Sequence, residues 1–574
     1  MQTPMDGFWL PSNIGEKILS TNTQYVTTSF CSGKACAPDA PGAITARWPV
    51  LQAGEWRRLV SLLQEGRQRS PVGKDYWARL ESALGEVEKR FKDPADPLHY
   101  KAMGSIPGYT GFSKPMIQFT LNSLNLMTLD QIPSAYSWYP EHTASNAWQS
   151  MQGLPGRVLF THAGPLGRFF NQFAGFRAGR KFDNLKAPDL VTGYGAGNVP
   201  GTALLITMLA QSTTMMGHTP PAVLVRNSRR EPIFTPLVLS GLERIAPELV
   251  SGIAVLVWDY TNYDLQKTLL EESDLVIAAA SDETITNLGT QISEINRTRS
   301  RSPIRFHKHG HKVSFSVISR AVTQRGQIDE ASQQPLINVV SLLTALDSIF
   351  WDQYGCLSSR IHFIEEVKEA HYTALDYALK LTEQLHMLSV YLPRGDSPRR
   401  PLKDSFDRYK LLESSGRVKV TSGYEDDFLV VVDSRPYDAL NFNSVVNACM
   451  GRVIFVRPVR DVMEFPDEYL RMLPPANLQS LSVAFGKDPN GLSDHFLSFS
   501  KACARRGVTA IRTIGRGAFP QLAYSWDGLL PLDLVNDRPR GYFTTFEFDN
   551  PYDEMIGTYR LFLSQADGLA VNES

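Results

Sequence analysis

The chain has 574 residues, of which 43% are apolar and 20% charged, a composition typical of a globular protein with two to four domains. Its 58 basic and 59 acidic residues leave a formal net charge of -1, without the excess of positive charge that general nucleic-acid binders carry. The most apolar run, 201–210, is shorter than the about 20 residues of a bilayer span. We therefore expect no nucleic-acid partner and no transmembrane segment. Five cysteines are too few for a disulfide scaffold, which favours a reducing, cytoplasmic location.

The N-terminal residues 1–112 are predicted to form a mostly helical extension. Residues 55–65 and 76–91 have helical spacing and many charges. The segment Cys31–Pro41 is rich in small residues and proline, which predicts a loop. Cys31 and Cys36 have C-x4-C spacing but no second Cys/His pair nearby, so a zinc site is not favoured there.

From about residue 155, short β-branched runs alternate with amphipathic stretches. The candidate strands are 189–192, 222–226, 253–258 and 274–279, and the candidate helices between them are 201–215, 236–245 and 265–271. Strand–helix alternation with Gly and Pro at the joints indicates a parallel, doubly wound sheet. We therefore predict an α/β fold with a Rossmann-type cofactor domain over residues 113–335.

A second α/β region is predicted over residues 336–520, as a catalytic domain. It contains a candidate long helix at 365–388, candidate strands at 428–432, 452–456 and 478–485, a loop at 394–401, and a helix at 493–506. The last helix begins after a good N-cap, Ser493, and ends at Gly507. Residues 521–574 are expected to return to the core or to an oligomer interface, with no assigned element after residue 550.

A glycine-rich turn, Val191–Gly201, lies between a candidate strand and a candidate helix. Gly195 and Gly197 allow the backbone to approach a ligand, and the following helix N-terminus favours a phosphate. The spacing G-x-G-x-G is not the dinucleotide fingerprint, so a tight strand-to-helix connection remains an equal alternative. Asn198, followed closely by Pro200, either projects over the substrate crevice or caps the next helix.

A basic cluster follows the candidate strand 222–226. It consists of Arg226, Ser228 and Arg229, at the end of the strand. An acidic residue at this position would favour a cofactor with a free ribose 2′-hydroxyl. Basic residues with a serine favour a 2′-phosphate, so the cluster predicts NADPH as the cofactor. The alternative is a solvated surface turn.

Cys356 lies in WDQYGCLSSR, between a helical stretch and a candidate strand. Small or polar neighbours place its thiol on a turn, where a nucleophile has access to substrate. Cys449 and Cys503 lie in apolar or helical context and are expected to be buried. A buried, inert thiol is the alternative for Cys356 as well.

Several segments, in this order along the chain, together resemble the LuxC-type long-chain acyl-CoA reductases of the aldehyde dehydrogenase superfamily. They are GAGNVPG at 195–201, SDETI at 281–285, RFHKHGHKVSFSVI at 305–318, WDQYGCLSS at 351–359 and SWDGLLPLDLVNDRP at 525–539. The resemblance covers roughly residues 113–546. It implies an aldehyde dehydrogenase-like fold and NADPH-dependent reduction of an acyl-CoA or carrier-bound acyl thioester to an aldehyde.

The resemblance also implies roles for matched positions. Cys356 falls where the family has its acylated nucleophile, and Asn198 where aldehyde dehydrogenases place the amide that holds the oxyanion. Arg226 falls where a basic residue meets the adenosine ribose, and Ser281 begins the turn that faces the pyrophosphate. An acyl-protein synthetase or carrier as partner, and a homo-oligomeric state, are implied in the same way.

One departure from hydrolytic aldehyde dehydrogenases bears on the reaction. Their water-activating glutamate motif is replaced here by Lys308–Lys312, which contains no acid, and this favours thioester reduction. His307, His309 and His311 alternate along a possible strand, which would place all three on one face and could form a metal site. The alternative is that His309 donates a proton in the reaction. We expect no metal. An aldehyde dehydrogenase or acyltransferase using Cys356, and a non-catalytic partner subunit, remain alternatives. The resemblance implies a long-chain fatty acyl group, and an aryl, amino-acyl or polyketide acyl group is equally compatible with these residues.

Overall fold

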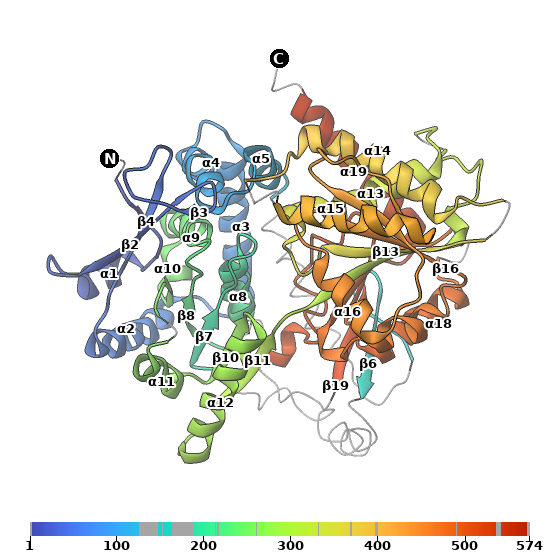
Figure 1. Cartoon of the computed structure of the whole chain (residues 1–574). Coiled ribbons are helices and arrows are strands. Elements are labelled where there is room, and N and C mark those ends of the chain that lie inside the picture. Colours follow the sequence, from blue (N-terminus) through green and yellow to red (C-terminus); the bar gives the residue numbers. More distant parts are fainter. Residues whose placement is uncertain are drawn as a thin grey trace. The chain divides into compact units, whose positions relative to one another are not determined.

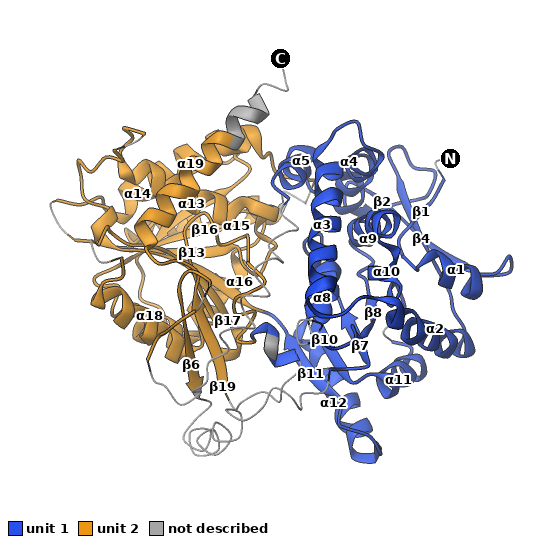
Figure 2. Ribbon diagram, turned by 180° about the vertical axis from the view of Figure 1, so that it is seen from behind, with its two compact units in different colours: residues 1–139, 181–311, 530–538 blue, residues 140–180, 312–529, 539–574 orange. Residues whose placement is uncertain are grey.

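Two units, each assembled from separate stretches of the chain, make up the computed structural model (Figure 2). Unit 1 consists of residues 1–139, 181–311 and 530–538, and unit 2 of residues 140–180, 312–529 and 539–574. The structure describes residues 3–124, 147–151, 153–162, 187–212, 214, 217–259, 261–330, 332–367, 370–396, 400–488, 491–534 and 541–570. None of the helices in these ranges is long and apolar enough to span a bilayer.

The centre of unit 1 is a five-stranded sheet in which every neighbouring pair is parallel. Its order is β11-β10-β7-β8-β9; Figure 1 labels β11, β10, β7 and β8. The strands are β7 (Leu190–Tyr194), β8 (Ala222–Arg226), β9 (Ile253–Leu256), β10 (Leu275–Ala279) and β11 (Arg305–His309). The chain starts at the central strand β7, adds two strands on one side, then returns and adds two on the other. This is the doubly wound order of a Rossmann-type sheet, and the predicted α/β class is confirmed.

Helices connect these strands; those over 202–211, 234–245 and 263–272 lie where helices were predicted, and the other two were not predicted. In chain order the helices are α8 (Thr202–Gln211), α9 (Phe234–Ile245), α10 (Pro247–Val250), α11 (Tyr263–Glu272) and α12 (Asp282–Thr298). Strands β7, β9 and β10 are buried at every residue, as parallel strands covered on both faces must be. Their continuous apolar runs explain why the sequence identified them.

The N-terminal residues belong to unit 1 rather than forming a separate extension. Trp9 exchanges two backbone hydrogen bonds with Val255 of β9, at 2.7 and 2.9 Å, and the hydroxyl of Tyr76 donates to Gln211 of α8 at 3.1 Å. The region contains the helices α1 (Ser12–Ile18), α2 (Ala53–Gly66), α3 (Gly73–Lys92), α4 (Pro97–Thr110) and α5 (Lys114–Asn122). It also contains a small sheet of order β1-β4-β2-β3, with β1 (Met5–Asp6), β2 (Tyr25–Cys31), β3 (Lys34–Ala35) and β4 (Ile44–Pro49).

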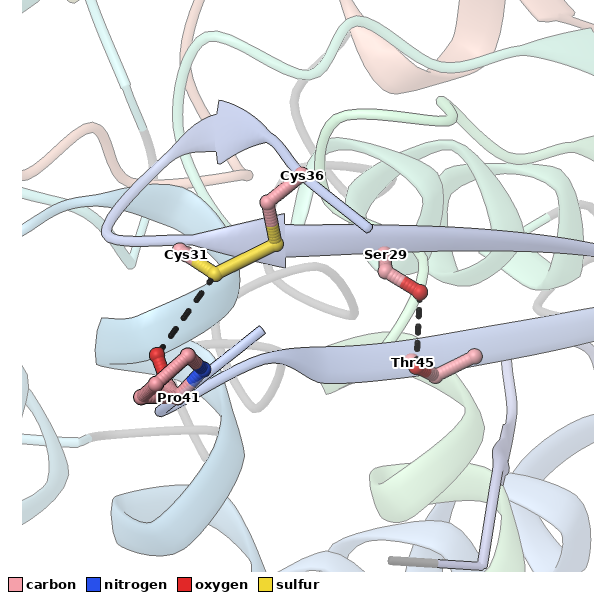
Figure 3. Close-up of a disulfide and its surroundings, with 5 residues drawn as sticks. All are labelled: Ser29, Cys31, Cys36, Pro41 and Thr45. Carbon is pink, nitrogen blue, oxygen red and sulfur yellow. Dashed lines mark hydrogen bonds between the residues drawn. A yellow bond between two sulfur atoms is a disulfide. The ribbon is translucent and has the colours of Figure 1, made fainter. Parts of the chain in front are cut away.

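A disulfide joins Cys31 and Cys36 across the β2–β3 hairpin (Figure 3). The loop predicted at Cys31–Pro41 is therefore wrong for its first residues, and the pairing of the two cysteines was not predicted. The physical reason is the turn. Ser32 and Gly33 both have positive φ, 49° and 74°, which is the geometry of a tight two-residue hairpin. It brings the two cysteine Cα atoms within 5.9 Å, inside the range that a disulfide spans.

Unit 2 is built on a ten-stranded sheet of order β14-β15-β16-β13-β12-β17-β18-β19-β6-β5. The strands from β15 to β19 are parallel, and the pairs at both edges are antiparallel. In chain order the strands are β5 (Gln149–Ser150), β6 (Arg157–His162), β12 (Val313–Ile318), β13 (Ser359–Glu365), β14 (Val418–Val420), β15 (Leu429–Asp433), β16 (Val453–Val459), β17 (Leu478–Ala484), β18 (Ala510–Thr513) and β19 (Gly541–Phe546).

The helices of unit 2 include one prediction that was confirmed in detail and one that began at the wrong residue. Helix α18 (Asp494–Arg506) has Ser493 as its N-cap and Gly507 in the left-handed conformation after its last residue, as predicted. The helix expected from residue 365 begins at Ala374, because Glu365 is the last residue of β13 and the capping box of Thr373 with Asp376 starts the helix only there. After residue 550, where no element was assigned, the chain forms α19. The remaining helices are α13 (Leu336–Ile349), α14 (Ala374–Tyr391), α15 (Arg400–Leu412), α16 (Ala439–Ala448), α17 (Phe465–Glu468) and α19 (Pro551–Ala570).

The units divide the chain differently from the expected domains. The division falls after residue 311 instead of residue 335, because β12 pairs with β13 on one side and β17 on the other. Residues 157–162, expected in the cofactor domain, form β6 and pair with β19 of the C-terminal segment. Of the loop predicted at 394–401, residues 397–399 lie outside the described residues, and residue 400 already begins α15.

Candidate active site

The carboxyl edge of the five-stranded sheet brings together most of the predicted cofactor residues. The N–H of Gly195, directly after β7, donates to the carbonyl of Arg226 at the end of β8, at 2.9 Å. A β-carbon at Gly197 would collide with the hydroxyl of Ser228 and lie 3.0 Å from Cβ of Arg230. Glycine is therefore required here for the turn after β7 to reach the turn after β8. Because β7 is also where the strand order reverses, this edge is the place where doubly wound folds bind nucleotides.

A buried carboxylate holds this turn, and the sequence analysis did not identify it. Glu231 is 3% exposed and its Oε1 accepts hydrogen bonds from the backbone N–H groups of Ile233 and Phe234, at 3.1 and 2.8 Å. It also accepts from the N–H of Gly201, and burial raises its pKa. Glu231 thus joins the start of α9 to Gly201, which has φ of 93° and is the N-cap of α8.

Asn198 is exposed on the same turn of unit 1. Gly201, rather than Asn198, is the N-cap of α8. The alternative that Asn198 is simply the helix cap is therefore not what the structure shows. Its predicted role toward an oxyanion stays a prediction.

The two arginines of the basic cluster differ in what they contact. Nε of Arg226 donates to the carbonyl of Trp258 at 2.9 Å, so this side chain is partly committed to the fold. Arg229 is half exposed, and its Nη2 lies 3.9 Å from Oδ2 of Asp259. Hydrogen bonds from the backbone and side chain of Thr261 lower the pKa of Asp259, and Arg229 and Arg226 lower it further. Asp259 was missed because it follows β9, whereas the basic cluster follows the neighbouring strand β8.

Ser281 and His309 also lie at this sheet edge. Ser281 is the N-cap of α12, where its hydroxyl accepts from the N–H of Thr284 at 3.3 Å. Oδ1 of Asp282 accepts from the N–H of His311 at 2.7 Å. This acid in the first turn of α12 makes the helix start less favourable for a pyrophosphate than expected.

Only two of the three alternating histidines lie on β11. His307 and His309 are 7% and 5% exposed, and His311 lies beyond the end of the strand. In the part of the chain that the structure describes, no group of three His, Cys, Asp or Glu side chains could hold a metal ion.

Cys356 lies in unit 2, on the tight turn that precedes β13. Of the three free cysteines, Cys449 and Cys503 are buried, and Cys356 is partly exposed. The hydroxyl of Ser314, from β12, donates to the carbonyl of Cys356 at 2.9 Å and lies 2.8 Å from the hydroxyl of Ser480 in β17. Three neighbouring parallel strands, β13, β12 and β17, thus position the turn at their amino ends.

Two residues that the sequence analysis missed surround the thiol. Burial and, to a smaller extent, the negative charge of Asp527 raise the pKa of Cys356, and a hydrogen bond from the side chain of Gln479 opposes them; the net pKa is about 11. Nε2 of Gln479 also donates to Oδ1 of Asp527 at 2.8 Å. Asp527 is in the segment 525–539 that carries the family resemblance, which was the one available signal; residues 535–539 of it lie outside the described residues.

The resting thiol should therefore be protonated near neutral pH. We expect the rate of alkylation of wild-type Cys356 by iodoacetamide to rise about tenfold per pH unit above about pH 8, without a plateau below about pH 10. Asp527→Asn removes the negative charge that disfavours the thiolate, so its alkylation rate at about pH 8 should be several-fold higher. Peptide mapping by mass spectrometry gives the rate at Cys356.

Asp407→Asn is the matched control, because it makes the same change at an exposed carboxylate of α15. It should leave the alkylation profile unchanged. A wild-type plateau near neutral pH, or equal rates in wild type and Asp527→Asn, would contradict this account of the thiol.

The geometry fits a nucleotide and a thiol nucleophile. The turn at Gly195–Gly197 offers a backbone cradle that a β-carbon would fill, and basic side chains stand at the adjoining strand end. A dinucleotide phosphate can use such a cradle. The turn at Cys356 holds a free thiol on a partly exposed residue, with the side-chain amide of Gln479 as a donor beside the sulfur. These features are independent of each other, since each is formed within its own unit.

Comparison with known structures identifies the fold. The Δ1-pyrroline-5-carboxylate dehydrogenase from Mycobacterium tuberculosis is similar with a TM-score of 0.53 and 14% identity, over 94% of this chain and 89% of that one. Aldehyde dehydrogenase 21 from Physcomitrella patens is similar with a TM-score of 0.53 and 10% identity, over 95% and 98%. The indole-3-acetaldehyde dehydrogenase of P. syringae, solved with NAD+, is similar with a TM-score of 0.52 and 10% identity, over 95% of this chain and 98% of that one.

The sequence itself gives the family. No curated protein matches the chain. The model of the acyl-CoA reductase (LuxC) family matches residues 179–537, which include the glycine-rich turn, the turn at Cys356 and Asp527. The chain therefore has the aldehyde dehydrogenase fold and belongs to the LuxC family of acyl-CoA reductases.

Proposed function

We propose that this protein reduces an acyl thioester to an aldehyde with NADPH, through an acyl group carried on Cys356. The observation that carries the proposal is the position of Cys356, a free cysteine that is partly exposed as a residue, on a turn anchored by three strands, in a chain of the acyl-CoA reductase family. The two other free cysteines are buried, so Cys356 is the free thiol best placed to receive an acyl group.

The first half-reaction transfers the acyl group. The sulfur of Cys356 attacks the thioester carbonyl, the bond to the carrier sulfur breaks, and the carrier thiol leaves with the proton that Cys356 gives up. The side-chain amide of Asn198 and the backbone N–H of Cys356 would stabilise the oxyanion. Exchange of one thioester for another is nearly isoenergetic, so orientation of the groups supplies most of the catalysis.

The second half-reaction is a reduction. NADPH, when bound, supplies the hydride that the acyl carbon needs. Gly195 and Gly197 would admit its phosphates, and Ser228 with Arg229 would bind its 2′-phosphate. The resulting thiohemiacetal on Cys356 collapses to free aldehyde, and the sulfur recovers a proton; His309 is the proposed proton donor. The sum consumes one acyl thioester, one NADPH and one proton, and yields aldehyde, carrier thiol and NADP+.

The test is a panel of acyl thioesters that varies both acyl chain and carrier. Without reductant, one acyl mass should appear on Cys356; with NADPH, the adduct should disappear as aldehyde forms in equal amount to the NADPH consumed. An unmodified mass with every thioester would reject the proposal. Tight binding of a partner enzyme without acylation would instead favour the non-catalytic alternative.

A second candidate function, oxidation of an aldehyde to an acid, is favoured by one observation. Asp527 is close enough to Cys356 to raise its pKa, and its carboxylate could activate water to hydrolyse an acyl-enzyme. The stretch Lys308–Lys312 contains no acid that could do so. Aldehyde with NADP+ distinguishes the two reactions. Fast formation of free acid would favour oxidation, whereas the proposed reductase should release acid slowly.

Cofactor preference should depend on Arg229. Arg229→Gln removes a charge-assisted hydrogen bond to the 2′-phosphate, so the ratio of kcat/KM for NADPH to that for NADH should fall about tenfold. Arg226 is a poorer target because it also binds the carbonyl of Trp258. Steady-state kinetics with both cofactors measure the ratio.

Asp259→Asn provides the reciprocal variant. It removes the carboxylate that faces Arg229 and would repel a 2′-phosphate, so it should raise the preference for NADPH. If neither variant changes the ratio, the turn after β8 does not select the cofactor.

Partners are proposed on the family resemblance, and the location on the small number of cysteines. We propose an acyl-protein synthetase or acyl carrier as the donor, a homo-oligomer as the working form, and the cytoplasm as the location. The Cys31–Cys36 disulfide argues against the last of these, because disulfides are rare in the cytosol.

A further inference from the structure

Three consecutive residues shortly before Cys356 adopt the left-handed conformation. Trp351, Asp352 and Gln353 have φ of 55°, 50° and 64°. Residues with a β-carbon rarely adopt this conformation, and successive ones are rarer still. Such strain persists only where the surrounding structure determines it, and it concentrates at functional sites. The left-handed turn therefore needs groups that hold it.

A buried ion pair holds the middle of this turn. Oδ1 of Asp352 lies 2.8 Å from Nε of Arg452, and the two side chains are 2% and 0% exposed. Oδ2 of Asp352 accepts from the N–H of Gly395 at 3.0 Å, and Nη2 of Arg452 donates to the carbonyl of Leu392 at 2.8 Å. The pair thus connects the turn to two other segments of unit 2.

Gln353 closes the loop that contains Cys356. Its Oε1 accepts from the N–H of Val453 at 2.8 Å, and its Nε2 donates to the carbonyl of Ser359, the first residue of β13, at 3.2 Å. One side chain therefore joins the residue before the cysteine turn to the residue after it. The segment between them can change its course only if these hydrogen bonds break.

Stability alone does not account for the ion pair. Removing two charges from water costs more than their attraction returns unless the geometry is very good, and apolar replacements of such pairs are often at least as stable. Here Nη1 of Arg452 is also buried without a hydrogen-bond partner among the described residues. In addition, Arg452 itself has a positive φ of 71°. Both partners are thus held in strained backbone, next to the turn of the nucleophile.

We propose that the Asp352–Arg452 pair, with Gln353, is a positioning device that fixes the left-handed turn and so orients the sulfur of Cys356 toward the acyl carbon. This inference rests on the proposed function and assigns positioning residues to the same site. A displacement of the nucleophile by about 1 Å can cost about 10²-fold in rate. The device should therefore affect the acylation step and leave cofactor binding unchanged.

Asp352→Asn is the first test. We expect the single-turnover acylation rate of Cys356 at saturating thioester to fall about 100-fold, with the KM for thioester and the Kd for NADPH within about threefold of wild type. Asp433→Asn is the matched control, because Asp433 is 1% exposed and its Oδ2 lies 2.6 Å from Arg435, at the end of β15. This control should acylate at the wild-type rate.

Further variants keep the test decisive if Asp352→Asn does not fold. Gln353→Gly removes both hydrogen bonds but suits a positive φ, so it should fold and acylate at least about tenfold more slowly. Arg452→Lys retains the charge and should keep more activity than Arg452→Met. Wild-type acylation in a folded Asp352→Asn or Gln353→Gly variant would overturn the inference, as would an equal loss in Asp433→Asn.

Alkylation separates this inference from the proposed function. If no thioester acylates wild type, the proposed function fails, yet the rate of iodoacetamide reaction at Cys356 still reports the environment of the sulfur. That rate should change at least about fivefold in Asp352→Asn and Gln353→Gly, and stay constant in Asp433→Asn. An unchanged rate in all three variants would reject the positioning role on its own.

Discussion

Cys356→Ser is expected to lower the NADPH-dependent turnover of an acyl thioester by about 10⁴-fold or more. Serine preserves the shape of the side chain, but its hydroxyl is a far weaker nucleophile than a thiol unless a base activates it. The adjacent groups around position 356 are an amide, Gln479, and the carboxylate of Asp527. Neither gives the serine an imidazole base of the kind that activates hydroxyl nucleophiles.

Two measurements check this result. Absorbance of NADPH gives the turnover, and intact mass after incubation with thioester shows whether the acyl adduct has disappeared. Cys449→Ser is the control, because Cys449 is buried and its sulfur donates to the carbonyl of Val445, a bond that serine can keep. An adduct that persists in Cys356→Ser, or that maps to another cysteine, would assign the nucleophile elsewhere.

The second large effect is expected at Asn198. Asn198→Ala removes one proposed donor to the oxyanion, and loss of one such donor lowers kcat by about 10²–10³-fold. Because Asn198 lies on the glycine-rich turn but is exposed, the substitution should leave the fold and the affinity for NADPH unchanged. Single-turnover kinetics should show both acylation and reduction slowed, since each passes through an oxyanion.

An exposed amide elsewhere in unit 1 is the control. Asn262 is the N-cap of α11, and its side-chain oxygen accepts from the N–H of Leu265 at 3.1 Å. Asn262→Ala removes this cap. It should cost about 1 kcal/mol of stability and no activity. If Asn198→Ala behaves as Asn262→Ala does, the oxyanion assignment is wrong.

Much of unit 1 could be predicted because its signals are local. The strands β7, β9 and β10 are buried throughout, so their apolar runs stand out from the helices between them. The glycines of the turn Val191–Gly201 mark a strand-to-helix turn in the sequence, whereas the steric need for Gly197 comes from Ser228 and Arg230 in the folded structure. In unit 2, Ser493 and Gly507 bounded α18 correctly because cap chemistry acts within one helical turn.

Contacts between distant segments could not be predicted. Nothing near Cys356 in the sequence points to Gln479 or Asp527, although both influence its pKa. The disulfide of Cys31 and Cys36 depended on the backbone of the turn between them, and a helix was predicted over the end of β13 because a short buried strand and the start of a helix have similar composition.

The sequence by itself therefore determined the alternation of strands and helices in unit 1, the glycine-rich turn, the basic strand end and the cysteine turn, because each element is encoded in a local stretch of residues. Only the tertiary structure decided which strands share a sheet, which acid stands beside the thiol, and how Arg452 meets Asp352, 100 residues away. The physical reason is that pairing and burial depend on the packing of remote segments, and neither the spacing nor the composition of a local stretch specifies its partner.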